Sequence, residues 1–579
     1  MTANPCTSLR WCLALLDGLL AAGLTRLVLS PGARSTPMVL AAQRCEAAGQ
    51  LPLTPILDER SAAFFALGLA RASGRPVALL ATSGSAPAHW YPAVIEAAET
   101  GLPLLLLSAD RPPRLRGFGA NQTIDQTRLF GAFVREAHDP GLPSADPATL
   151  KAIRALGLRA GTQAQGPHPG PVQVNLPFDE PLVPDADCIA AADLVAPPPG
   201  PGRPPPVPGL RLDGLQPGDW PAGRGLLVCG PGADRAGLAA LPWPSLAALA
   251  LPVLADPLSG LRTTPAADAM VCSSHYDSLL RHPAAAALRP DWVLRVGAAP
   301  VSKTLGRWLA GIPSILCDPA GGWSDPEHDL IARLTAPPAA LLAALAAAGV
   351  GTPDADWYAR WGAAEARVAA LAAAELATAP WCEGQVIRTL FPHLAPDEAL
   401  LCSNSLPIRQ LDTWSGPLPP GVRVLGNRGV SGIDGQLSTL AGSNAAGVPT
   451  WGLLGDLSLC HDLSGLLLAE HWQRPLLVIN NGGGRIFDYL PQRGLPDYER
   501  LWRTPVAPPL AALAAAFGVV HQAVGDAAAL SAALAAPPPR PLLIEVQIDA
   551  ERSRAMHQDY WRRVAADPLL DRLLRAAGR

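Results

Sequence analysis

The 579-residue sequence has no C-x-x-C pair, no two adjacent histidines and no uninterrupted apolar run of 18 residues. Its ten cysteines are scattered, so neither a paired-cysteine metal site nor a disulfide framework is indicated. We therefore expect reduced, mostly buried thiols in a cytoplasmic protein. The missing apolar run predicts no membrane span, and the stretch from Trp11 to Leu20, interrupted by Asp17, has the spacing of an amphipathic helix.

Neither sign of charge dominates the chain. It has 45 Lys and Arg residues and 49 Asp and Glu residues, which gives a formal net charge of -4. This balance provides no general field for nucleic acid or anionic lipid, so neither partner is expected. Any anionic ligand must be held by local groups. Apolar residues make up 49% of the chain, which is enough for several packed cores.

Short apolar strands alternate with helical stretches in three blocks. The sequence predicts an α/β domain over residues 1–190, a proline- and glycine-rich linker over 191–222, a central α/β domain over 223–378 and a third over 379–579. Such alternation is typical of parallel sheets with helices on both faces. We predict an α/β fold of three doubly wound parallel-sheet domains, with one Ala-rich helix near 338–375 closing the second.

The strongest local pattern lies in the third block. The predicted strand "TWGLLGD" ends in Asp456, and the strand "PLLVIN" ends in Asn480 and Asn481, followed by three glycines. With a helix expected between them ("HDLSGLLLAEHW"), both ends should meet at the carboxyl edge of neighbouring parallel strands, where open α/β sheets bind ligands. Each dipeptide alone is equally typical of an ordinary strand-end turn.

Asp456, the amide oxygen of Asn481 and the backbone carbonyl of Gly483 are hard oxygen ligands of the kind that Mg²⁺ prefers. The glycines also let backbone amides approach phosphate oxygens. This pattern resembles the diphosphate-binding motif of thiamine-diphosphate enzymes, although that motif usually opens G-D-G and Leu457 stands third here.

The resemblance to thiamine-diphosphate enzymes implies a glutamate that activates the cofactor, and such a glutamate suits a dry pocket that raises its proton affinity. Glu59 fits, because it follows the strand "LTPILD" and precedes the apolar helix "SAAFFALGLA". The alternative is that Asp58 and Glu59 only favour the start of that helix through its dipole.

Longer strings resemble one family, the succinyl-enolpyruvyl-hydroxycyclohexene-carboxylate synthases of menaquinone and phylloquinone synthesis. They occur in the same order over about residues 8–490, with little of the likeness in the second block. The strings are "SPGARSTP", "DER", "ATSGSAPAHWYPAVIEA", "SADRPP", "GANQTIDQ", "SNSLPIRQLD", "NRGVSGIDGQLST", "GDLSLCHDLSGLL" and "NNGGGRIF".

The resemblance implies three domains of the thiamine-diphosphate enzyme type: a pyrimidine-binding domain, a central domain and a diphosphate-binding domain. It implies thiamine diphosphate and Mg²⁺ as cofactors, with Mn²⁺ as a substitute. The implied reaction is decarboxylation of 2-oxoglutarate and conjugate addition of the succinyl carbanion equivalent to isochorismate. Because the ring and the diphosphate are held by different domains, usually of different subunits, a homodimer or homotetramer is implied.

The resemblance also assigns site residues. Glu59 is the catalytic residue. The metal ligands are Asp456, Asn481 and Gly483. The cofactor-binding positions are Glu59, Ser405, Leu406, Ser431, Gly432, Ile433, Gly455, Asp456, Leu457, Ser458, Asn481, Gly483 and Gly484, with Ile433 supporting the bent cofactor. Positions near isochorismate are Arg34, Arg111, Asn121, Gln122 and Lys303. Positions near the 2-oxoglutarate moiety are Ser405, Arg409 and Arg428, and Ile486 and Phe487 form an apolar wall.

Arginine suits these positions because both substrates are dicarboxylates. Two alternatives stay open. One is another thiamine-dependent enzyme: pyruvate-type decarboxylases use an adjacent histidine pair, which this chain lacks, and acetolactate-type enzymes bind a flavin, for which the second block has no phosphate loop. The other is a non-enzymatic paralogue that kept the fold.

Overall fold

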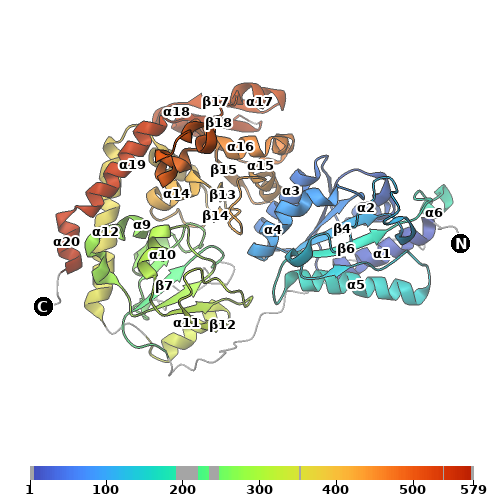
Figure 1. Cartoon of the computed structure of the whole chain (residues 1–579), viewed down its shortest axis with the longest axis horizontal. Coiled ribbons are helices and arrows are strands. Elements are labelled where there is room, and N and C mark those ends of the chain that lie inside the picture. Colours follow the sequence, from blue (N-terminus) through green and yellow to red (C-terminus); the bar gives the residue numbers. More distant parts are fainter. Residues whose placement is uncertain (1–4, 191–219, 234–246, 351–353, 539, 576–579) are drawn as a thin grey trace. The chain divides into compact units, whose positions relative to one another are not determined.

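Three six-stranded sheets form the framework of the computed structural model, which describes residues 5–190, 220–233, 247–350, 354–538 and 540–575 (Figure 1). The strand pairs within each sheet are parallel, and helices flank the sheets. The predicted α/β fold of three parallel-sheet domains is confirmed. Of the predicted linker, only residues 220–222 belong to the described part, and the domain boundaries stay a prediction.

Packing divides the described residues into two units. The first unit comprises the described residues up to 190 together with Asn427–Val448 and Asp462–Trp472. The second comprises the described residues from 220 to Gly426, Pro449–His461 and the residues from Gln473 onward.

The sheet of the first unit has the order β2-β1-β3-β4-β6-β5. Its strands are β1 (Arg26–Leu29), β2 (Leu53–Pro55), β3 (Val77–Ala81), β4 (Leu104–Asp110), β5 (Ala137–His138) and β6 (Val172–Pro177). The helices of this unit are α1 (Pro5–Ala21), α2 (Thr36–Ala47), α3 (Glu59–Ser73), α4 (Tyr91–Thr100), α5 (Pro147–Gln165), α6 (Ala186–Ala190) and α15 (Gln436–Ala445). Apolar residues of α1, α2 and α5 form one core with the sheet.

Helices α3 and α15 pack unusually closely within the first unit. A Cβ atom on Gly68 of α3 would lie 2.2 Å from the carbonyl oxygen of Thr439, and one on Gly442 of α15 would lie 2.0 Å from that of Phe65. Only glycine therefore fits at either position, since a side chain would force the helices apart. This contact ties the segment after Asn427 to the helix that begins at Glu59.

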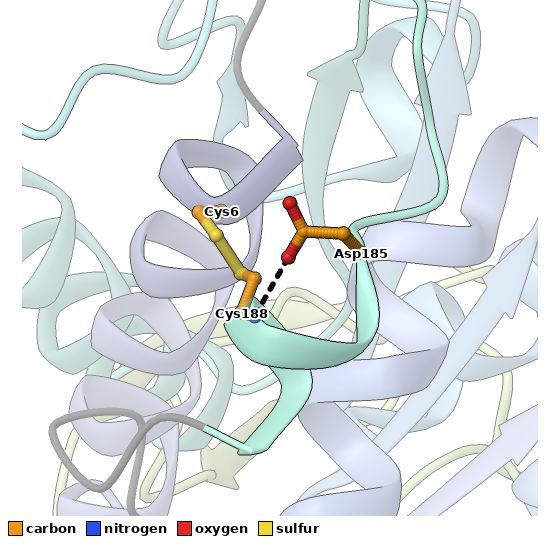
Figure 2. A group of neighbouring side chains, drawn as sticks. All are labelled: Cys6, Asp185 and Cys188. Atoms are coloured by element: carbon orange, nitrogen blue, oxygen red, sulfur yellow. Dashed lines mark hydrogen bonds between the residues drawn. A yellow bond between two sulfur atoms is a disulfide. The ribbon is translucent and has the colours of Figure 1, made fainter.

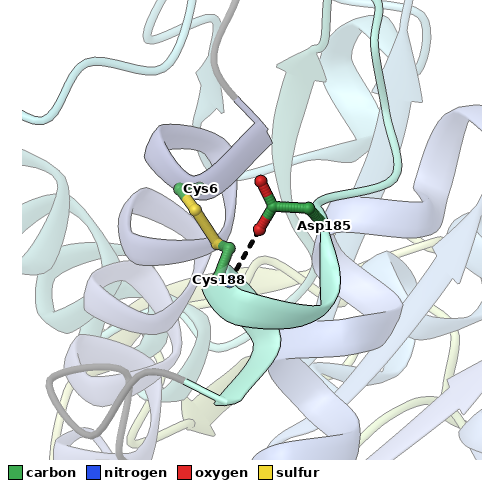
Figure 3. Close-up of a disulfide and its surroundings, with 3 residues drawn as sticks. All are labelled: Cys6, Asp185 and Cys188. Carbon is green, nitrogen blue, oxygen red and sulfur yellow. Dashed lines mark hydrogen bonds between the residues drawn. A yellow bond between two sulfur atoms is a disulfide. The ribbon is translucent and has the colours of Figure 1, made fainter.

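A disulfide joins Cys6 of α1 to Cys188 of α6, with the two Cα atoms 5.8 Å apart (Figure 3). The expectation of ten reduced thiols is therefore wrong for this pair, because folding brings together residues 182 positions apart. The carboxylate of Asp185 accepts a 2.7 Å hydrogen bond from the Cys188 backbone amide (Figure 2). The three side chains have the donor types of a metal site, but the disulfide bond leaves no thiolate for a metal. The other eight cysteines are free, seven of them buried.

We expect reduction of the Cys6–Cys188 bond to lower the free energy of unfolding, because the bond closes a long loop in the unfolded chain. The loop-closure model gives an upper value of about 5 kcal/mol for such a separation. Chemical denaturation with and without reductant measures the effect, and Cys188→Ser should make the stability independent of reductant. Cys460→Ser, which changes a free half-buried thiol, should keep the dependence. Alkylation of both Cys6 and Cys188 without prior reduction would contradict this prediction.

The second unit holds two sheets. The central sheet has the order β12-β11-β10-β7-β8-β9. Its strands are β7 (Gly225–Cys229), β8 (Val253–Ala255), β9 (Cys272–Ser273), β10 (Trp292–Val296), β11 (Ser314–Cys317) and β12 (Leu330–Leu334). Its helices are α8 (Thr264–Ala269), α9 (Tyr276–Leu279), α10 (Lys303–Leu309), α11 (Pro338–Ala347) and α12 (Ala355–Thr378). The single helix predicted near 338–375 is wrong: α11 ends at Ala347, followed by Gly349 with a positive φ of 69°.

The third sheet has the order β14-β13-β15-β16-β18-β17, which repeats the order of the first sheet strand for strand. Its strands are β13 (Ala399–Cys402), β14 (Arg423–Leu425), β15 (Thr450–Gly455), β16 (Leu476–Asn480), β17 (Val520–Val524) and β18 (Leu542–Gln547). Its helices are α13 (Glu383–Leu390), α14 (Leu406–Trp414), α16 (Asp456–His461), α17 (Leu510–Ala516), α18 (Ala527–Ala535), α19 (Ala550–Ala565) and α20 (Pro568–Arg575). The helix predicted over "HDLSGLLLAEHW" is instead the end of α16 followed by a 3-10 helix, η11 (Leu463–His471).

A buried ion pair fastens α14 to the central sheet within the second unit. The guanidinium of Arg262, which is 1% exposed, donates to the carboxylate and the backbone oxygen of Asp412 and to the carbonyl of Ala255. A charge buried this deeply persists only when such bonds satisfy it. The orientation of α14 is thereby fixed.

Among the helices of the described residues, none combines the length and the apolarity needed to cross a bilayer.

Candidate active site

Three strand ends of the third sheet meet at one edge. Strand β15 lies between β13 and β16, and the strand order reverses between β13 and β15, the position at which open α/β sheets bind ligands. The Gly455 amide donates to Ser403 Oγ over 3.3 Å, which ties the end of β15 to the end of β13. We expected the strands before Asp456 and Asn481 to be parallel neighbours, and this is confirmed because β15 pairs with β16.

The carboxylate of Asp456 points into the turn that follows β16. It is 3% exposed, and its oxygens accept from the Gly483 amide at 2.8 Å and the Leu457 amide at 2.7 Å. Burial raises the pKa of Asp456, while backbone hydrogen bonds from Gly483, Leu457 and Asn481 oppose that rise. A desolvated carboxylate beside a strand-end turn fits the binding of a cation.

Three successive glycines give this turn its shape. Gly482, Gly483 and Gly484 have φ values of 81°, 76° and 55°, a left-handed run that residues with side chains rarely adopt. A Cβ on Gly484 would lie 2.0 Å from the carbonyl oxygen of Arg503. The run therefore bends the backbone into a tight curve, in which the Gly482 and Gly483 amides donate to Asn480 Oδ1 and to the Asp456 carboxylate.

The residue that starts α14 is strained. Ser405 has φ 72° and ψ −127°, outside the regions that a serine ordinarily occupies. Its carbonyl oxygen accepts a 2.5 Å hydrogen bond from the guanidinium of Arg409, one turn further along. Strain of this kind is concentrated at ligand sites. Of the neighbouring predicted residues, Leu406 and Ser458 are buried, and Leu457, Ile486 and Phe487 are half-buried.

In the first unit, three predicted substrate residues gather around Ser83, which follows β3. The Arg111 guanidinium donates to Ser83 Oγ, which itself donates to the Gln122 carbonyl over 3.1 Å, and Gln122 Nε2 donates back to the Ser83 carbonyl over 3.0 Å. Arg34 lies nearby. Burial is the main cause that lowers the pKa of Arg111, and the positive charge of Arg34 lowers it further. Neighbouring like charges favour an anionic ligand. Asn121, beside Gln122, is exposed.

Arg34 is 6% exposed and is held on two sides. Its guanidinium donates to the carbonyl of Phe178 and to the carboxylate of Glu180, each over 3.0 Å. The loop before Arg34 also lies against the loop after β3, since a Cβ on Gly32 would lie 2.3 Å from the Cβ of Thr82. The ends of β1 and β3 are the reversal point of the first sheet, so this cluster lies where ligands bind in such sheets.

Glu59 is the first residue of α3 and is half-buried. Asp58, and not Glu59, is the N-cap: its side chain accepts from the backbone amides of Arg60 and Ser61. Asp58 alone thus satisfies the helix start, which removes the need for Glu59 in that role.

The predicted cofactor residues Ser431, Gly432 and Ile433, and the predicted substrate residue Arg428, belong to the first unit. The buried carboxylate of Glu96 fixes their loop, because it accepts from the amides of Gly429 and Val430 over 3.0 and 2.9 Å and pairs with Arg71.

Lys303 belongs to the second unit, where it is the exposed first residue of α10. With Arg295 and Arg307 it lines a cavity of about 340 Å³ in the central domain. It lies in a different unit from Arg34, Arg111 and Gln122, so the five residues predicted near isochorismate are not gathered within one unit.

Three further side chains hold these loops and were not predicted from the sequence. Ser83 and Glu96 lie inside the string "ATSGSAPAHWYPAVIEA", and Gln126 lies inside "GANQTIDQ", so the signal was present. Gln126 is fully buried, accepts from the Gly84 amide over 2.8 Å and donates to the Ala109 carbonyl over 3.0 Å.

Comparisons with known proteins point to one family. Residues 13–129 match the family described as thiamine pyrophosphate enzyme, N-terminal TPP binding domain. Proteins named 2-succinyl-5-enolpyruvyl-6-hydroxy-3-cyclohexene-1-carboxylate synthase are similar to the chain over most of its length. The one from Dechloromonas aromatica is 40% identical over 89% of this chain and 93% of its own. Those from Geobacillus kaustophilus and Sorangium cellulosum are 42% and 38% identical, over 85% and 91% of this chain and 86% and 90% of their own.

Proposed function

Because the chain belongs to the 2-succinyl-5-enolpyruvyl-6-hydroxy-3-cyclohexene-1-carboxylate synthases, thiamine-diphosphate-dependent enzymes, we propose that it uses 2-oxoglutarate and isochorismate as substrates. The proposed reaction removes carbon dioxide from 2-oxoglutarate and joins the remaining four-carbon unit to the isochorismate ring, in menaquinone or phylloquinone biosynthesis. The observation that carries the proposal is the buried Asp456 carboxylate against the amides of the glycine turn.

In this proposal Asp456, Asn481 and the Gly483 carbonyl would hold Mg²⁺, and the glycine turn would lie beside the diphosphate. The desolvated carboxylate supports this assignment, since a divalent cation compensates its buried charge. When bound, thiamine diphosphate supplies the carbon nucleophile that makes loss of carbon dioxide from a 2-oxoacid possible. Glu59 holds a proton toward the aminopyrimidine ring, and Ile433 supports the bent cofactor.

The arginines set the substrate class. Arg34 and Arg111 are neighbouring guanidinium groups that suit the two carboxylates of isochorismate, with Gln122 and Asn121 as polar contacts. Arg409 and Arg428 are proposed for the 2-oxoglutarate carboxylate, and Lys303 for a central-domain contact with isochorismate. The assembly as a homodimer or homotetramer rests on the resemblance and the cytoplasmic location on the scattered cysteines, and both stay predictions.

The deciding experiment incubates the chain with isochorismate, 2-oxoglutarate, thiamine diphosphate and Mg²⁺ and identifies the product by mass. We expect a product that retains the isochorismate skeleton and gains four carbons. Efficient turnover of pyruvate without turnover of 2-oxoglutarate would contradict the proposed substrates. Thermal unfolding with the cofactor and Mg²⁺ tests the cofactor itself, because a bound ligand must raise the stability of the folded state.

Arg409→Ala is expected to weaken the use of 2-oxoglutarate selectively. The loss of a charge-assisted pair with a carboxylate predicts a rise in KM for 2-oxoglutarate of roughly 10- to 100-fold, and little change for isochorismate. Steady-state kinetics with each substrate varied in turn measures the split. Arg423→Ala is the matched control, because Arg423 is an exposed arginine of the edge strand β14. Unchanged kinetics for 2-oxoglutarate in Arg409→Ala would remove the role assigned to Arg409.

A further inference from the structure

We propose that Glu383 and Ser553 are positioning residues for Asn481, a metal ligand of the proposed function on which this inference rests. Asn480 and Asn481 follow each other at the end of β16, and the side-chain nitrogen of each donates to a different glutamate. Asn480 Nδ2 donates to Glu545 Oε1 over 2.7 Å, and Asn481 Nδ2 donates to Glu383 Oε1 over 3.5 Å. The two side chains are therefore drawn toward different elements, β18 and α13.

The side-chain amide of Asn480 is hydrogen-bonded within the protein at both ends. Its Oδ1 accepts from the Gly482 amide over 3.4 Å, so both ends of its amide have partners within the protein. Asn481 differs, because only its donor end has a recorded partner among the described residues. An amide has one accepting oxygen and one donating nitrogen. With the nitrogen toward Glu383, the oxygen of Asn481 is left for a ligand, which is the orientation that a cation requires.

Glu383 is itself fixed. It is the first residue of α13 and is 3% exposed, and its Oε2 accepts a hydrogen bond from Ser553 Oγ. Ser553 belongs to α19, is also 3% exposed, and lies 170 residues further along the chain. The carboxylate is thus held between the strand-end turn and helix α19, with the serine on one oxygen and Asn481 on the other.

This arrangement has two consequences for a cation at the site. Turning the donor end of Asn481 toward a metal would remove its contact with Glu383, so this contact favours the orientation in which the oxygen is the ligand. The buried negative charge of Glu383 also attracts a divalent cation through a medium of low dielectric constant. A glutamine at this position keeps the volume and can still accept from Ser553. However, it removes the charge and can offer Asn481 either end of its amide.

The test is the Mg²⁺ dependence of thermal stabilisation at saturating thiamine diphosphate. In Glu383→Gln, the Mg²⁺ concentration at half-maximal stabilisation is expected to rise roughly 10- to 100-fold, the usual effect of removing a partner of a metal ligand. Ser553→Ala, which frees one oxygen of Glu383, is expected to move the midpoint in the same direction by less.

Glu398→Gln is the matched control. Glu398 is also 3% exposed, but it lies at the start of β13 and bonds to Trp451 Nε1 and Arg474. This variant is expected to lower the melting temperature without moving the Mg²⁺ midpoint. If the wild-type protein is stabilised but Glu383→Gln and Ser553→Ala keep its midpoint, the positioning role is overturned and the proposed function stands. If the wild-type protein shows no such stabilisation, the proposed function fails. If Glu383→Gln does not fold, Ser553→Ala decides.

Discussion

Replacing Glu59 with glutamine is expected to abolish turnover while leaving the binding of thiamine diphosphate largely intact. The substitution keeps the size of the side chain and its position at the first residue of α3, but it removes the group that holds the proton. Proton transfer by a positioned side chain contributes roughly 10²- to 10⁴-fold to rate, which sets the expected loss in kcat. Kinetics and cofactor-dependent thermal stabilisation, measured on the same preparation, separate the two effects.

Asp58 provides a control one residue away. Its carboxylate caps α3, and asparagine caps helices about as well as aspartate, so Asp58→Asn should fold and retain turnover. A Glu59→Gln protein with full activity would overturn the role of Glu59. A variant that loses cofactor stabilisation together with activity would instead place Glu59 among residues needed for binding alone.

The ends of strands were the most predictable part of the molecule. The apolar runs before Asp456 and Asn481 are unbroken, and parallel strands place such ends on one edge, so local patterns sufficed. The same holds for Arg111, which directly follows β4. The repeated strand order of the first and third sheets was only weakly visible, because strand order depends on packing between distant segments and not on local pattern.

Contacts between distant segments could not be predicted. Cys6 and Cys188 carry no spacing signal, since 182 residues separate them. Glu383 of α13 contacts Asn481 and is itself bonded by Ser553 of α19, 170 residues further along the chain, and neither lies in a recognisable motif. The 3-10 helix η11 was also missed, because the apolar run of "LSGLLLAEH" has no feature that separates it from an α-helix.

Asp456→Asn is expected to remove the stabilisation by Mg²⁺ and thiamine diphosphate and with it the activity. A ligand at a hundredfold excess over its Kd stabilises a protein by about 2.7 kcal/mol, so the loss is readily measured by thermal unfolding. Asparagine can still accept a hydrogen bond from the Gly483 amide, which should preserve the turn. Asp567→Asn is the control, because Asp567 is a buried aspartate that pairs with Arg367 on α12, not with the glycine turn.

Without ligands, Asp456→Asn should lower stability less than Asp567→Asn. Burial raises the pKa of Asp456, so its charged form at neutral pH costs folding free energy, and asparagine removes that cost. The pKa of Asp567 is lowered, chiefly by its hydrogen bond to Arg367, so its charge stabilises the fold. Asp456→Asn relieves the cost of the buried charge but loses one of the two backbone hydrogen bonds to the carboxylate, whereas Asp567→Asn loses a stabilising charge without such relief. A full Mg²⁺-dependent shift in Asp456→Asn would contradict the assignment, since it would show that the cation binds without the charged carboxylate.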